Sequence, residues 1–162
     1  MGEPLNRPLR LAALAALIVV AGGWLAYENV WRNGGAKPLR YRDQTAALAP
    51  LEPAEETQGV FGRRDQLARY LRGTRPGQPL HLPQIAFSRD EAVLFATGPR
   101  SSNGYALQVV SAREERGRAV FTFREQTPGL DEPQQARVTY PYRLLVFRKL
   151  GKPVYFELQG RP

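Results

Sequence analysis

The chain has 162 residues, enough for one ordinary domain with a modest core once its apolar N-terminal block is set aside. It has no cysteine, which excludes disulfides, thiolate metal sites, a cysteine nucleophile and a lipid-modified cysteine. His81 is the one histidine, so we expect no metal site, no cofactor and no enzymatic activity. The formal charge of +8 comes from arginines interleaved with acids, without a run of like charges, so we expect no nucleic-acid partner.

The first distinctive element is an uncharged apolar segment at residues 11–27, LAALAALIVVAGGWLAY, which follows a short tail at 1–10. As a helix it would extend about 25 Å, the short limit for crossing the hydrocarbon core. Arginines precede it, and aromatic residues near its end suit the membrane interface. We therefore predict a transmembrane signal-anchor at 11–27, with 1–10 as a cytoplasmic tail.

A cleaved, secreted form is the alternative, because small residues at 21–23 also suit a signal peptide. Bulky Trp24 and Leu25 follow them and no clear Ala-x-Ala site is present, which favours the uncleaved anchor. More basic residues follow the segment than precede it, which by itself would place the C-terminus inside. The short leading tail favours the opposite orientation, so we predict a single-pass cell-membrane protein whose C-terminal domain is periplasmic or extracellular.

After the segment, residues 28–37 read as a linker and 38–162 as the folded domain. A first strand is expected at 39–45. The Pro-containing stretch 46–56 is expected to run extended over the surface. In 63–72, RRDQLARYLR, leucines and a tyrosine recur at helical spacing before Gly73, which predicts one short amphipathic helix.

From residue 92 the pattern changes to short runs rich in β-branched and aromatic residues, separated by Gly or Pro. The runs are AVLFAT, YALQVVSA, RAVFTFRE, ARVTY, YRLLVF and PVYFEL, which predict five or six strands. Hairpin loops are expected at 113–118 and, more tightly, at 150–152. The predicted fold is mainly β (α+β), a small antiparallel β-sandwich or curled sheet with one short helix laid on it.

The segment from about 58 to 158 resembles the PrcB C-terminal domain family, named for an accessory subunit of a bacterial cell-surface protease complex. The resemblance is carried by RRDQLARYLRG, LPQIAFSRDEAVLFATGPRSSNGYALQVVSA, FREQTPG and VTYPYRLLVF. Its most specific piece spans residues 98–105, where Asn103 stands in place of the first glycine of a usual Gly-Gly-Tyr. Because Asn tolerates positive φ, we expect the turn to be kept. The resemblance implies an accessory role, without catalytic residues to carry over.

Two segments are candidate partner-binding sites, because glycine-bounded loops and exposed tyrosines on a β scaffold often make recognition contacts. Their residues are Pro99, Arg100, Ser101, Ser102, Asn103, Gly104, Tyr105, Tyr140, Pro141 and Tyr142. The plainer interpretation is that proline and glycine only fix a strand connection, and that the tyrosines pack at a strand bend. Adjacent acids at 90–91 and 114–115 diverge on any regular element and do not form an acid–base pair.

We therefore predict a membrane-anchored, extracytoplasmic, non-enzymatic domain that binds another protein, as an accessory subunit of a secreted or surface protease complex or beside another envelope protein. One alternative is a protease-inhibitor module, since the 98–104 loop faintly resembles the inhibitory loop of chagasin-type inhibitors. The other alternative is a structural cell-envelope protein.

Overall fold

The computed structural model describes residues 35–74, 77, 79–129 and 133–160. The chain divides into two compact units, Met1–Ala36 and Lys37–Pro162, and the second is described here. The predicted segments 1–10 and 11–27, with residues 28–34 of the predicted linker, lie outside the described residues. Within the described ranges, no helix is both long and apolar enough to cross a membrane.

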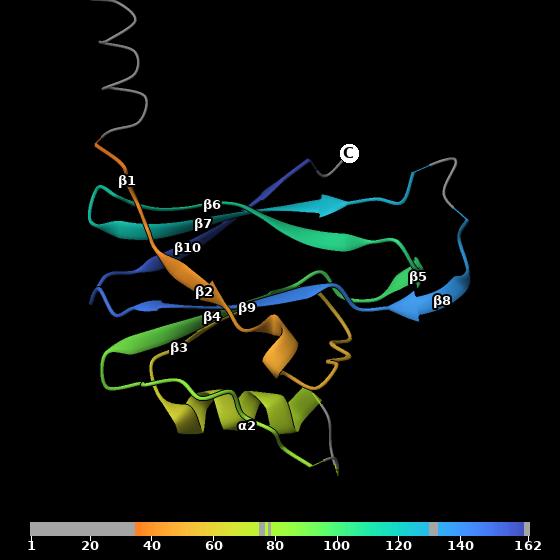
Figure 1. Cartoon of the computed structure of the whole chain (residues 1–162), viewed down its shortest axis with the longest axis horizontal. Coiled ribbons are helices and arrows are strands. Elements are labelled where there is room, and N and C mark those ends of the chain that lie inside the picture. The colour runs from red at the N-terminus through yellow and green to blue at the C-terminus, as the bar shows by residue number, and fades with distance from the viewer. Residues whose placement is uncertain (1–34, 75–76, 78, 130–132, 161–162) are drawn as a thin grey trace, which may run out of the picture. The chain divides into compact units, whose positions relative to one another are not determined.

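Eight strands form two four-stranded sheets (Figure 1). Sheet A has the order β1 (Lys37–Pro38), β6 (Ala106–Glu115), β7 (Arg118–Gln126), β10 (Val154–Gln159). Sheet B has the order β2 (Tyr41–Asp43), β9 (Tyr142–Arg148), β4 (Asp90–Ala96), β3 (Thr57–Phe61). The remaining described elements are β5 (Arg100–Ser102) and β8 (Ala136–Thr139), which pair with each other, the 3-10 helix η1 (Thr45–Ala47) and the α-helix α2 (Arg64–Thr74).

Sheet B is the middle of three layers, with sheet A on one face and α2 on the other (Figure 1). Alternate residues of its central strand β4 therefore enter different cores. Val93 and Phe95 pack with Phe121 and Phe123 of sheet A, whereas Leu94 joins the cluster that includes the helix residues Leu67 and Leu71. Burial on both faces explains why β4 is a continuous apolar run. The expected mainly β fold with one α-helix is confirmed in this part of the chain.

Helix α2 begins and ends close to the predicted bounds. Leu67 and Leu71 lie on the buried face, and Asp65 occupies the first turn, where a carboxylate is favoured by the helix dipole. The Gln66 side chain accepts a hydrogen bond of 3.0 Å from the Gly62 backbone N–H, just before the helix. The helix continues through Gly73 to Thr74, whose hydroxyl donates to the Leu71 carbonyl at 3.0 Å.

Two segments before the helix differ from the prediction. Strand β3 was not predicted because its sequence, TQGVF, is short and contains a glycine. Gly59 leaves space for the ring of Phe61 two residues on, since a Cβ at Gly59 would lie 2.6 Å from that ring. The stretch 46–56 was expected on the surface, but Leu48 and Leu51 are buried in the core beside α2. They cover apolar surface that the single short helix leaves open.

The hairpin expected at 113–118 is confirmed, but it is tighter than expected. Strands β6 and β7 run on to Glu115 and from Arg118, and both turn residues, Arg116 and Gly117, have positive φ, as in a type I′ turn.

The hairpin expected at 150–152 is wrong. This connection carries the chain from β9 in sheet B to β10 in sheet A, where β10 pairs parallel with β7 from Val154 to Gln159. Loop length alone could not predict this change of sheet, because a short connection can either form a hairpin within one sheet or lead to a strand of the facing sheet.

Candidate functional site

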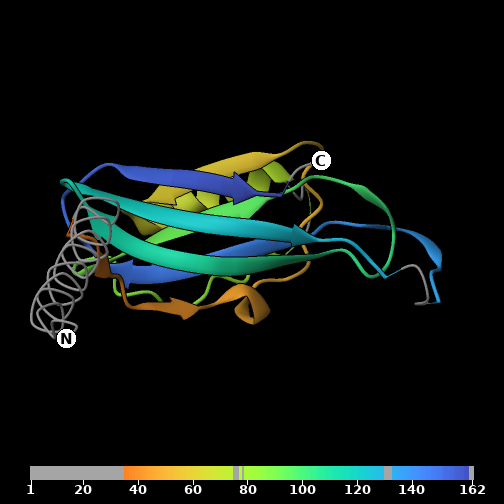
Figure 2. The same cartoon turned by 90° about the horizontal axis from the view of Figure 1, so that it is seen from above.

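Strands β5 and β8 form a two-stranded ribbon at one end of the two sheets, hereafter the β5–β8 ribbon (Figures 1 and 2). Each strand belongs to a connection that crosses between the sheets. Strand β5 lies between β4 of sheet B and β6 of sheet A, and β8 lies between β7 of sheet A and β9 of sheet B. Because the two connections run in opposite directions, they pair as antiparallel strands, with a register shift between Arg100 and Ser102.

Hydrogen bonds hold the two connections together along their length. Where they leave the sheets, the backbone N–H of Thr97 donates to the Pro141 carbonyl at 3.0 Å. In the middle, the Thr139 hydroxyl donates to the Ser102 carbonyl at 2.8 Å. Farther along, the Gln135 backbone N–H donates to the Asn103 side-chain oxygen at 2.8 Å. The ribbon is therefore a tethered element and not two independent loops.

A charged pair attaches the ribbon to sheet A. Arg100 donates from Nε to Oε1 of Glu125 at 2.5 Å and from Nη2 to Oε2 at 2.9 Å, a bidentate arrangement. The two side chains are only 19% and 13% exposed. The hydrogen bond to Glu125 raises the pKa of Arg100 above its ordinary value. The Arg100 side chain thus connects the ribbon to sheet A.

The two sequence segments predicted to bind a partner meet at the ribbon. Their residues differ in exposure. Pro99, Ser101 and Gly104 are exposed, Arg100, Asn103, Tyr105, Tyr140 and Tyr142 are half-buried, and Ser102 and Pro141 are buried. Tyr142 packs against the core beside α2, as the plainer interpretation held for the tyrosines. The predicted set therefore mixes anchoring residues with surface residues.

The turn expected at Asn103 and Gly104 is present, but it does not use positive φ at Asn103. Asn103 does not have positive φ, and its side chain instead makes the hydrogen bond to Gln135. The positive φ values lie at the glycines on either side, +77° at Gly98 and +91° at Gly104. A Cβ on Gly98 would lie 3.0 Å from the Glu55 backbone, so this glycine also allows a close approach of two segments.

Strand β8 supplies surface residues that were not singled out from the sequence. Ala136, Arg137 and Val138 are exposed, and Val138, at 57%, is the most exposed large hydrophobic residue of the described ranges. In the described residues β8 pairs with β5 alone, so its other edge presents backbone groups without a neighbouring strand. Nothing in the run ARVT distinguished it from the buried strands.

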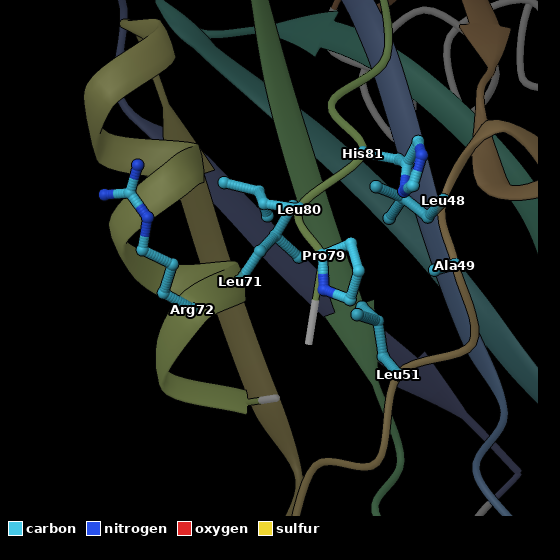
Figure 3. A pocket seen from close by; sticks show the side chains of 8 residues that line it. All are labelled: Leu48, Ala49, Leu51, Leu71, Arg72, Pro79, Leu80 and His81. Atoms are coloured by element: carbon cyan, nitrogen blue, oxygen red, sulfur yellow. The ribbon is translucent and has the colours of Figure 1, made fainter. Parts of the chain in front are cut away.

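The lone histidine lies at a separate, smaller feature (Figure 3). His81 lies beside Leu48 on the rim of a cavity of about 20 Å³ between the end of α2 and the connector after it. The lining is mostly apolar, from residues such as Leu51, Leu71 and Leu80. A cavity of this size holds about one water molecule. Among the described residues, no acidic side chain lines this cavity.

Fold and site together define a small β/β/α domain with an anchored ribbon at one end. Residues 92–148, from β4 to β9, match the family model described as PrcB C-terminal. The resemblance expected from the sequence is thus confirmed over that segment, whereas α2 and β10, also included in the expected resemblance, lie outside the match. No curated protein and no solved structure matches the chain significantly.

Proposed function

We propose that this protein is a non-enzymatic accessory domain of a protease complex, and that it binds its protein partner along the β5–β8 ribbon. The ribbon lies wholly inside the segment that matches PrcB C-terminal. That match supports an association with a protease complex. The observation that carries the choice of surface is the open edge of β8, where Val138 is 57% exposed.

An open edge strand binds an extended partner segment by adding a strand to the sheet. Backbone hydrogen bonds would supply affinity, and exposed side chains such as Arg137 and Val138 would supply selectivity. The ion pair of Arg100 with Glu125 and the hydrogen bonds across the ribbon hold this edge in place before binding. A pre-ordered edge loses less conformational entropy when the partner arrives.

The proposal places the domain outside the cytoplasm, attached to the membrane through residues 11–27. Its support is the uncharged apolar segment itself, with arginines before it and aromatic residues near its end. Anchoring would keep the domain beside a surface or envelope partner and raise the local concentration of the ribbon there.

Affinity capture of the tagged full chain from gently solubilised native membranes tests the proposal, with mass spectrometry of co-purifying proteins. We expect a protease, and we expect Val138→Lys to lower its recovery, because the ammonium group would be placed in the contact. The matched control is Val60→Lys, which alters an exposed valine on β3, an edge strand of sheet B.

Equal recovery with both variants would overturn the ribbon as the contact surface. Recovery of the chain alone would contradict the accessory function. The activity of the captured protease, measured with and without this protein, distinguishes assistance from inhibition.

A further inference from the structure

Four of the arginines gather at one place on sheet B. Arg40 and Arg42 at β2, Arg89 before β4 and Arg148 at the end of β9 line two adjoining hollows of about 200 and 330 Å³. The hollows share Arg42, Asp90 and Arg148. We name these four arginines with Asp90 the arginine basin.

The sheet register explains why the basin forms. Asp90 pairs with Arg148, and Arg42 pairs with Val146, two residues earlier on β9. Residues two apart on a strand share a face, so Arg42, Asp90 and Arg148 all lie on the face of sheet B that packs against α2. Val146 belongs to the core beside the helix, whereas Arg42 and Arg148 are exposed. The face of sheet B that packs against α2 therefore extends beyond the apolar core and ends in exposed charged side chains.

The charges of the basin are unbalanced. Among the described residues, Asp90 is the one carboxylate that lines it, and its side chain is only 10% exposed. It accepts a 2.8 Å hydrogen bond from Arg42 and lies 3.8 Å from Nε of Arg89. Arg40 and Arg148 make no ion pair with any described residue. Lys149 follows immediately, and its ammonium group donates to the Gly62 and Phe87 carbonyls.

We propose that the arginine basin binds phosphate groups, and that their source is the headgroups of anionic phospholipids. Guanidinium groups match phosphate oxygens with paired hydrogen bonds, and Asp90 holds Arg42 in position for such contacts. The choice of a lipid rests on the proposed anchor at 11–27. Twelve residues lie between Tyr27 and Arg40, so the chain from one to the other reaches at most about 45 Å when fully extended. A linker of this length allows the basin to reach the headgroups, where attraction to anionic lipid acts within about a Debye length.

The first experiment measures phosphate chemistry without a membrane. The full chain in a neutral detergent is titrated calorimetrically with inorganic pyrophosphate, and compared with the double variant Arg40→Gln/Arg148→Gln. We expect affinity to fall on the order of tenfold, because two of the four guanidinium groups are lost. The control is Arg72→Gln/Arg124→Gln, which removes the same charge from exposed arginines outside the basin. Equal weakening in both double variants would show a net-charge effect and would overturn the site.

The second experiment tests the lipid source. The chain has no cysteine, so Ser88→Cys, in the exposed turn before Arg89, accepts a single fluorophore. The labelled full chain is placed in nanodiscs of phosphatidylcholine, with or without phosphatidylglycerol, that carry headgroup spin labels. We expect stronger quenching with phosphatidylglycerol, and loss of the difference in Arg40→Gln/Arg148→Gln but not in the control. Equal quenching in both lipids overturns the lipid source.

Co-elution of the chain with the discs reports the anchor separately, so failure of the basin is distinguishable from failure of the proposed anchoring. Pyrophosphate binding without a lipid effect would support the phosphate site and overturn its assignment to a membrane.

Discussion

Gly104 illustrates how a single residue fixes the ribbon. Its φ of +91° lies in the region that suits glycine, and a Cβ there would lie 2.7 Å from Cβ of Pro128. Gly151 also has positive φ, +63°, but a Cβ there would meet nothing within 4 Å. Substitution at Gly151 would therefore incur backbone strain alone, whereas substitution at Gly104 would incur backbone strain and a steric clash with Pro128.

We predict that Gly104→Ala lowers the free energy of unfolding by about 2–3 kcal/mol, the sum of backbone strain and displacement of Pro128. Gly151→Ala, the control, should cost about 1 kcal/mol from backbone strain alone. Urea unfolding followed by circular dichroism measures both. Equal losses would show that the contact with Pro128 does not contribute.

Strand β10 illustrates what a peripheral element contributes. It is the last strand of sheet A and the one parallel neighbour among the pairs of the described sheets. Phe156 points into the core between the sheets, with its ring centroid 6.1 Å from that of Phe95 and 6.3 Å from that of Phe123. Tyr155 points to the other face, is 49% exposed and lies beneath the Arg118 guanidinium group at 5.1 Å.

We predict that Phe156→Ala lowers the free energy of unfolding by about 3 kcal/mol, because it removes an aromatic ring from the inter-sheet core. Tyr155→Ala should cost at most about 1 kcal/mol, the cation–π contact included. Thermal and urea unfolding give both values. Similar losses in the two variants would contradict the placement of β10, in which Phe156 faces the core and Tyr155 faces solvent. A shift of register by one residue would exchange the two side chains between the faces of the sheet.

The described domain as a whole carries a polar network on sheet A. Arg113 donates to Glu115 at 3.1 Å and to Glu157 at 2.9 Å, and the Thr122 hydroxyl also donates to Glu157 at 2.9 Å. The pKa of Glu115 lies below its ordinary value of 4.5 because of hydrogen bonds from Arg113 and Arg118. For Glu157, burial raises the pKa, but hydrogen bonds from Arg113 and Thr122 together outweigh it and lower the pKa.

A lowered pKa means that the folded protein binds fewer protons than the unfolded chain in the same pH range. The resulting stability is fully present above the unfolded value of about 4.5 and is lost as the pH falls through the lower folded values. We therefore predict that the urea midpoint falls between pH 5 and pH 3. In Arg113→Gln the fall should be shallower. Arg124→Gln, whose hydrogen-bond partner is the uncharged Gln159, should retain the full slope. An unchanged slope in Arg113→Gln would contradict the role of the network.

Much of the fold was predictable because local sequence carries its signals. The six predicted β runs from residue 92 onward all coincide with strands, since β-branched and aromatic runs between glycines and prolines need no knowledge of the partner strand. Leucines at helical spacing located α2 in the same way. The family resemblance was also readable from ordered local motifs, and it is confirmed over residues 92–148.

The sequence by itself thus determined the strands after residue 92, the helix, the family resemblance and the classes of chemistry that a chain without cysteine cannot perform. The tertiary structure decided which sheet each strand joins, including the parallel place of β10, because pairing depends on contacts far apart in the chain. It also brought residues 99–105 and 140–142 together at one ribbon. The arginine basin formed for the same reason, since sheet register gathers residues that the sequence separates by as many as 108 positions.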